Sequence, residues 1–120
     1  MPDRTLGRIQ TRAAFAQVQR SRSRASCGPV RATFVPVPPS SEGIYPQVGY
    51  AISKKCGNAV TRNTLRRRMR DVARAEATVL PRGLYLLRLE PAAATAAPWQ
   101  FRADVAQALQ RAVQSGKVTA

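Results

Sequence analysis

Histidine is absent from this chain of 120 residues, and acidic side chains are scarce, with six Asp and Glu in total. Without an imidazole the chain lacks the usual general base and the usual catalytic triad. A two-metal nuclease site needs clustered carboxylates. The acidic residues are instead scattered: Asp3, Glu42, Asp71, Glu76, Glu90 and Asp104. Helix-end charges or ion-pair partners explain them better than catalysis, so we expect no catalytic residue and no metal bound by the protein alone.

Long apolar runs are also missing. No stretch approaches the length of a transmembrane span, and the first residues lack the apolar segment of a signal peptide, which predicts a cytoplasmic protein. Only two cysteines occur, Cys27 and Cys56, far apart and in unrelated contexts. Neither a disulfide nor a metal site is expected from them; buried or bystander thiols fit better.

Positive charge is abundant. The formal net charge is +14, from 20 Lys and Arg against six Asp and Glu, and such self-repulsion favours a polyanionic partner. Nucleic acid is preferred over a membrane surface because the most basic segment offers few large apolar anchors. The apolar content of 44% suffices for one small core, so residues 1–120 are interpreted as a single RNA-binding domain. We expect about 8–115 to fold, with 1–7 and 116–120 flexible.

Hydrophobic periodicity and turn residues predict the element order. Thr11 is the expected cap of a short helix that ends at about Arg20, and further helices are expected over 59–77 and 99–115. Expected strands cover 30–37, 48–53 and 84–89. The segments 21–26, 38–43 and 91–98 are expected to be loops, and Pro36 should confine its strand to an edge or a frayed end. The pattern predicts an α+β sandwich, with helices covering one face of a sheet and the other face left free.

The segment after the second predicted strand carries the strongest signal. At about 100° per residue, its basic residues and one Asn gather within roughly 140° of arc, opposite an apolar stripe. The polar set is Arg62, Asn63, Arg66, Arg67, Arg70 and Arg74, and the apolar set is Leu65, Met69, Val72 and Ala73. One face of this helix therefore suits a core, and the other suits RNA phosphates.

Several neighbouring residues allow two interpretations. Asn58 and Asn63 either contact RNA through their amides or cap and turn the local backbone. Lys54 and Lys55 stand at a strand end, where one reaches phosphate while the other is solvated. Arg22 and Arg24 lie in a predicted loop and extend the basic track.

The basic segment resembles the signature of the protein subunit of bacterial ribonuclease P. The matching residues are Arg62-Asn63, Arg66-Arg67 and Arg70-Asp71, preceded by Lys54-Lys55 and Gly57-Asn58-Ala59-Val60. The resemblance spans roughly residues 8–115 and is most specific between Val48 and Asp71. Three positions depart from the usual pattern: Asp71 replaces the more frequent Glu, Arg66 stands where Lys is frequent, and Thr33 stands where an aromatic is common.

The resemblance implies an α-β sandwich of order α-β-β-β-α-β-α, with the basic helix in a left-handed β-α-β crossover. It implies that the RNA subunit carries the catalytic Mg²⁺ and removes the 5′ leader of precursor tRNA, while the protein assists within the holoenzyme. Docking on that RNA is implied for Arg62, Asn63, Arg66, Arg67, Arg70, Lys54, Lys55 and Asn58. A cleft between the sheet and the first helix is expected to hold the leader, lined by Phe15, Arg12, Arg31 and Thr33.

Two other classes compete with this interpretation. A general RNA-binding or ribosome-associated protein of similar fold would bind structured RNA without stimulating cleavage of precursor tRNA. A DNA-binding regulator is disfavoured because a continuous Arg face suits phosphate better than base readout, and no short helix at turn spacing precedes it. Phe15 also has an alternative role, because an aromatic at helical spacing from Val18 is usually a core residue.

Overall fold

The computed structural model describes residues 7–9, 12–21, 23–36, 46–81 and 83–118. Several sequence expectations fall outside these ranges: the helix cap at Thr11, the basic residue Arg22, the loop at 38–43, and the flexible ends at 1–6 and 119–120.

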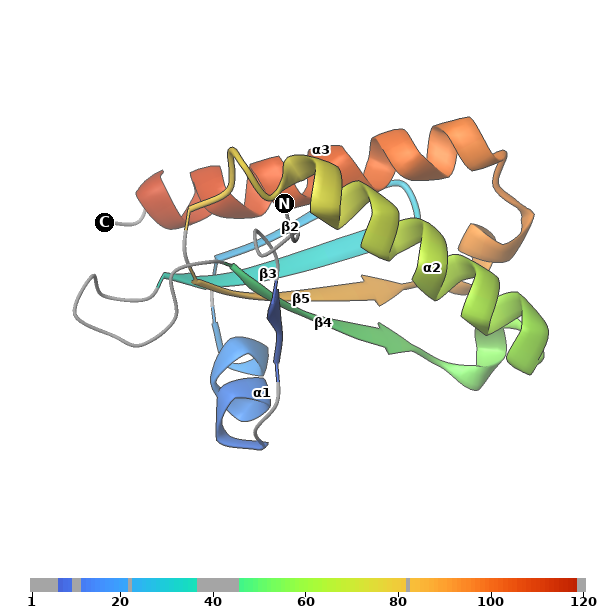
Figure 1. Cartoon of the computed structure of the whole chain (residues 1–120), viewed down its shortest axis with the longest axis horizontal. Coiled ribbons are helices and arrows are strands. Elements are labelled where there is room, and N and C mark those ends of the chain that lie inside the picture. Colours follow the sequence, from blue (N-terminus) through green and yellow to red (C-terminus); the bar gives the residue numbers. More distant parts are fainter. Residues whose placement is uncertain (1–6, 10–11, 22, 37–45, 82, 119–120) are drawn as a thin grey trace, which may run out of the picture.

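The described elements follow the predicted order closely (Figure 1). The strands are β1 (Gly7–Arg8), β2 (Ser23–Cys27), β3 (Val30–Pro36), β4 (Gln47–Ile52) and β5 (Gly83–Leu89). The α-helices are α1 (Arg12–Gln19), α2 (Ala59–Glu76) and α3 (Pro98–Val118). Two short 3₁₀ helices, η1 (Lys54–Cys56) and η2 (Pro91–Thr95), follow β4 and β5. The predicted α-β-β-β-α-β-α order is confirmed, with the two-residue β1 added before it.

The strands form one mixed sheet in the order β1-β4-β5-β3-β2. β4 pairs in parallel with β5 and with β1, whereas β3 pairs antiparallel with β5 and β2. The basic helix α2 connects the parallel strands β4 and β5, as the resemblance implies. The left hand of this crossover stays a prediction.

The main core lies between the sheet and the pair α2 and α3. Alternate strand residues supply it, such as Phe34 and Tyr85, which are register partners whose rings stack with centroids 4.8 Å apart. α2 contributes its apolar stripe, with Leu65, Met69 and Ala73 buried as predicted. Successive side chains of β4 and of the other strands point to opposite faces of the sheet, so the second face also needs a cover.

The first helix covers part of that second face, which corrects the prediction of helices on one face only. α1 lies across the sheet from α2 and α3 (Figure 1), and it buries a small cluster of Ile9, Val18, Leu84 and Leu86. Phe15 packs against the same cluster, above Gly49, where a Cβ would lie 3.1 Å from its ring. Gly49 therefore permits the close approach of α1 to β4.

Other boundaries differ from the sequence expectation. The basic loop predicted at 21–26 is largely the strand β2, because its residues pair with β3 and Ala25 and Cys27 pack on the main core. β3 lies between β5 and β2, so it is not an edge strand, although Pro36 does stand at its end. The loop at 91–98 contains η2, and α3 extends to Val118, beyond the predicted folded region. Gly7 likewise belongs to β1.

Both cysteines are free thiols, Cys56 buried and Cys27 half-buried, as expected. No helix in the described part of the chain is long and apolar enough to cross a membrane.

Candidate nucleic-acid interface

The N-terminus of α2 is built by a compact turn. Gly57 has a φ of +139°, which favours glycine, and its N–H donates to the Lys54 carbonyl at 3.2 Å. Asn58 is the N-cap, and its side chain accepts a hydrogen bond from the Thr61 N–H at 2.9 Å. The structure therefore gives Asn58 the capping role that the sequence left open.

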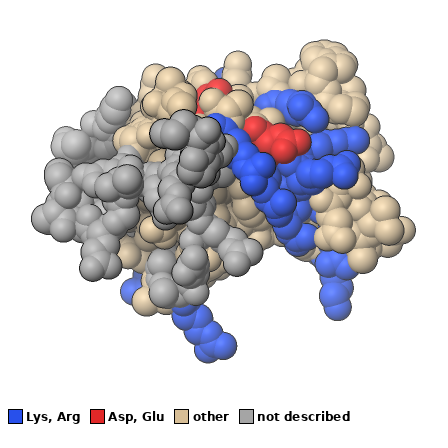
Figure 2. All heavy atoms as spheres, viewed as in Figure 1, with Lys and Arg blue, Asp and Glu red and all other residues tan. Residues whose placement is uncertain are grey.

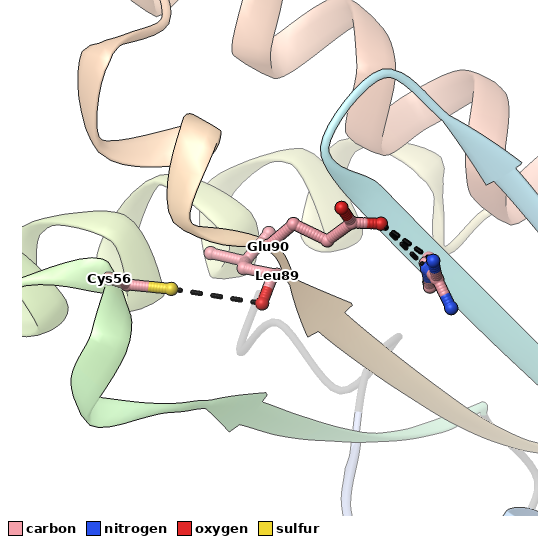
Figure 3. Close-up of polar contacts among 4 residues, drawn as sticks. Cys56, Leu89 and Glu90 are labelled. Carbon is pink, nitrogen blue, oxygen red and sulfur yellow. Dashed lines mark hydrogen bonds and ion pairs between the residues drawn. The ribbon is translucent and has the colours of Figure 1, made fainter.

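The preceding lysines project from η1, which is tied to the end of β5. Lys54 and Lys55 are exposed, whereas Cys56 is buried and its thiol donates to the Leu89 carbonyl at 3.7 Å (Figure 3). Sulfur makes only weak hydrogen bonds, so burial of Cys56 is the main reason that η1 stays docked. The lysines are thereby presented next to the first turn of α2.

The arginines on the polar face of α2 differ in whether they make hydrogen bonds within the protein. Arg62 donates from Nε to the Gly57 carbonyl at 3.2 Å, and Arg66 donates from Nη1 to the Asn63 amide oxygen at 2.9 Å. Arg67 and Arg70 are exposed, and no hydrogen bond or ion pair links either one to another described residue. Asn63 thus positions Arg66, while Arg67 and Arg70 have their full donor sets available.

Positive charge is concentrated where this helix lies. Figure 2 shows Lys and Arg gathered on the half of the molecule in which Figure 1 draws α2, with few acidic side chains between them. Such a field attracts a polyanion and is screened by salt. Tyr50 lies under this face: burial raises its pKa, and nearby Arg70 and Arg74 partly offset that rise.

The sheet face on the side of α1 is only partly covered, and a cavity of about 420 Å³ opens there. This sheet cavity is lined by Gln19, Arg24, Ala25, Ser26, Arg31, Ala32, Thr33, Leu86 and Arg88. A second cavity, of about 510 Å³, lies at the end of β4 and is lined by Tyr50, Ala51, Ile52, Ser53, Arg66, Arg88 and Leu89. Arg88 lines both, and Arg66 connects this edge cavity to α2.

The arginines of the sheet cavity differ in their partners. Arg24 donates from Nε to the Ser21 carbonyl at 2.8 Å and from Nη2 to the Gln19 carbonyl at 2.6 Å, so it caps the end of α1. Arg31 forms an ion pair with Glu90 at 2.8 Å. The Arg88 guanidinium has no hydrogen bond or ion pair with a described residue. Arg88 is therefore the uncommitted cation of this cavity.

Only two of the four residues expected to line the leader cleft lie in the sheet cavity. Arg31 and Thr33 line the sheet cavity, whereas the half-buried Phe15 and the exposed Arg12 line neither cavity. Arg88 was missed, although the sequence carries a signal for it. It is the one charged residue of β5 and shares the alternation phase of Leu84 and Leu86, which face α1.

A protein-bound metal is not supported by the donor set. The chain has no His, and no group of three or more Cys, Asp and Glu in the described ranges could hold a metal ion. The described carboxylates lie on α2, at the end of β5 and on α3. The interface has cations and hydrogen-bond donors for binding phosphate, but no group placed for acid, base or nucleophilic catalysis.

Comparisons with known proteins agree with this picture. Residues 4–113 match the family model of ribonuclease P. The ribonuclease P protein component of Kocuria rhizophila is 37% identical over 113 residues, covering 89% of this chain and 96% of that protein. The corresponding protein of a Synechococcus strain is 36% identical, with 88% and 80% covered.

Solved structures share the fold at lower identity. The RNase P protein from Staphylococcus aureus superimposes with a TM-score of 0.72 at 20% identity, covering 86% of this chain and 92% of that one. The RNase P protein from Thermotoga maritima gives a TM-score of 0.72 at 20% identity, with 87% and 96% covered.

Proposed function

The chain belongs to the bacterial ribonuclease P protein family. From this membership we propose that α2 and η1 bind the catalytic RNA subunit and that the sheet cavity receives the 5′ leader of precursor tRNA. The chain is the protein subunit of the ribonuclease P holoenzyme and serves tRNA processing, which implies association with the RNA subunit. The two surfaces and their division of labour are the proposed part.

Docking on the RNA subunit is assigned to the polar face of α2 and to η1. The observation that carries it is the pair Arg67 and Arg70, which are exposed and have no hydrogen bond or ion pair with a described residue. A planar guanidinium grips two phosphate oxygens and stacks on exposed bases, so an uncommitted Arg pair suits a structured RNA. The remaining members are Arg62, Asn63, Arg66, Lys54, Lys55 and Asn58.

Leader binding is assigned to the sheet cavity because it presents Arg88 and Arg31 beside an open floor of small and apolar side chains. A single strand needs a basic track for its phosphates and flat surface for its bases. The edge cavity continues this track to Arg66, so one strand passing over Arg88 would reach α2. Phe15 has its packing role in the structure; we keep base stacking by Phe15 and phosphate contact by Arg12 as part of the proposal.

Catalysis is assigned to the RNA subunit, together with the Mg²⁺ that the reaction uses. The protein then acts by binding and positioning, which requires phosphate contacts and no acid, base or nucleophile of its own. This division agrees with a chain that has no His and widely spaced carboxylates.

The test is cleavage of a precursor tRNA by the RNA subunit from the same source at low Mg²⁺, with and without this chain. We expect the chain to restore correct 5′ cleavage, to be inactive alone, and to lose much of its effect as the Arg66→Ala/Arg67→Ala variant. The matched control is Arg102→Ala, which removes an exposed arginine from α3. A chain that binds RNA without changing cleavage would favour the general RNA-binding alternative.

A further inference from the structure

We infer that Glu90 is an internal counter-anion of the sheet cavity, which a leader phosphate must displace from Arg31. The inference rests on the proposed binding of the leader in this cavity and adds a residue that tunes its strength. Glu90 would weaken leader binding, so its removal should tighten the complex.

The need for a counter-anion follows from the register of the sheet. Arg31 of β3 and Arg88 of β5 are direct partners, and both side chains lie on the face toward α1 and line the sheet cavity. Like charges directly opposite each other on adjacent strands repel. The free protein must therefore hold two guanidinium groups close together on one sheet face.

Glu90 supplies the compensating charge at the diagonal position. It follows Arg88 by two residues, and its Oε1 accepts from both Nε and Nη2 of Arg31, each at 2.8 Å (Figure 3). The Nε and Nη2 donors of Arg31 could also bind two oxygens of one phosphate. Carboxylate and phosphate therefore compete for the same donors.

The pair is weak enough to open. The two side chains are 64% and 47% exposed, and exposed ion pairs contribute little net stability because water and salt screen them. A phosphate in the cavity would also meet Arg88, which the carboxylate does not contact. A phosphate bound by both Arg31 and Arg88 is therefore favoured over the Glu90 carboxylate, which binds Arg31 alone.

The backbone of Glu90 is held on both sides, so the exchange requires movement of the Glu90 and Arg31 side chains only. The Glu90 N–H donates to the Pro29 carbonyl, and the Glu90 carbonyl accepts from Ala93 N–H, both at 2.9 Å. The backbone of Glu90 is therefore anchored at the junction of β5 and η2. The other described acidic residues lie on α2 and α3, which cover the opposite face. Among the described residues, Glu90 is thus the carboxylate that confronts a leader phosphate.

The test measures the affinity of the reconstituted holoenzyme for precursor tRNA and for mature tRNA, with wild-type chain, Glu90→Gln and Glu76→Gln. Glu76→Gln removes the same charge from α2, where Glu76 accepts from Gln110 at 2.7 Å. We expect Glu90→Gln to bind precursor about two- to five-fold more tightly at low salt, the range of an exposed ion pair, with mature tRNA unchanged. The salt dependence should steepen by up to about one unit of log-log slope. An affinity equal to that of Glu76→Gln, or weaker than wild type, would overturn the inference.

A double-mutant cycle adds a second readout. Arg31→Gln should cost more precursor affinity in the Glu90→Gln background than in the wild type, because only the freed guanidinium is fully available to the RNA. Equal costs would refute the competition between Glu90 and phosphate. If the wild-type holoenzyme binds precursor no better than mature tRNA, the proposed leader site itself fails, which separates the two outcomes.

Discussion

At the scale of single residues, the arginines of the sheet face are distinguished by what already holds them. Arg24 is bonded to the carbonyls that end α1, Arg31 is paired with Glu90, and Arg88 is uncommitted within the described structure. Their charge alone therefore does not predict how much each arginine contributes to RNA binding. Arg24 is expected to matter for the stability of α1, and Arg88 for binding.

Arg88→Gln should weaken binding of precursor tRNA by the holoenzyme by about tenfold, the cost of one charge-assisted contact, and leave mature tRNA unaffected. The salt dependence should become shallower by about 0.7 units of log-log slope, as for one contact to a single strand. Equilibrium binding across a salt series measures both. Arg102→Gln on α3 is the control for net charge, and equal losses for the two variants would contradict the assignment.

Tyr85 gives a prediction on stability and pH. Burial raises the pKa of Tyr85 above its ordinary value of about 10, and its hydroxyl donates to the Pro81 carbonyl at 2.6 Å. The folded state thus keeps a proton that the unfolded chain loses, so the stabilising contribution is complete below about pH 10 and is lost as pH rises above it.

The free energy of unfolding should therefore fall above about pH 10, and Tyr85→Phe should reduce that fall while costing about 1 kcal/mol at neutral pH from the lost hydrogen bond. Urea unfolding at a series of pH values measures this. Tyr50→Phe is the comparison, because Arg70 and Arg74 offset part of the rise in its pKa. Parallel pH curves for wild type and Tyr85→Phe would contradict the prediction.

At the scale of elements, the turn from η1 into α2 combines folding with binding. Gly57 allows the tight turn, Asn58 caps the helix, and the lysines before them face solvent. The Lys-Lys-Cys-Gly-Asn order is thus explained first by local structure. Its placement beside Arg62 and Arg66 then extends the basic surface.

Asn58→Ala should lower the free energy of unfolding by about 1 kcal/mol through loss of the N-cap. Asn58→Asp keeps the cap and should retain stability, but it places a negative charge on the proposed RNA-binding surface and should weaken affinity for the RNA subunit. Urea unfolding and RNA binding of both variants separate the two roles. A fully stable Asn58→Ala protein would show that the cap contributes nothing.

The sequence predicts elements well where local pattern dominates. α2 has an apolar stripe, a cap and a following Pro81, so its predicted bounds agree with the observed ones to within about one residue. β2 was missed because Ser23, Arg24 and Ser26 look like a loop, and its strand state depends on pairing with β3 and packing under α3. The position of α1 was missed for the same reason: only tertiary contact with Gly49 and Leu86 reveals which face it covers.

The candidate site shows the same division. The arginines of α2 were predictable because helical periodicity places them on one face. Arg88 and its relation to Arg31 and Glu90 depend on strand register, which pairs residues 57 positions apart in the chain. The capacity of Arg67 or Arg88 to bind RNA depends further on hydrogen bonds that no sequence pattern specifies.

At the scale of the whole molecule, the sheet separates two basic surfaces. α2 lies on one face with α3, and the sheet cavity opens on the face of α1 (Figure 1). The edge cavity, through Arg66 and Arg88, is where the two surfaces meet. In the proposed arrangement the protein contacts the catalytic RNA and its substrate at once, and the net charge of +14 predicts that both contacts depend on salt.

The most direct test of this account is to compare two double variants in the holoenzyme. Affinity for the RNA subunit and the ratio of precursor to mature tRNA affinity are measured for Arg67→Ala/Arg70→Ala and for Arg31→Gln/Arg88→Gln. We predict that the α2 variant loses affinity for the RNA subunit but keeps the leader-dependent ratio once assembled. The sheet variant should assemble normally and bind precursor and mature tRNA alike. Equal effects of the two variants on both quantities would contradict the separation of surfaces.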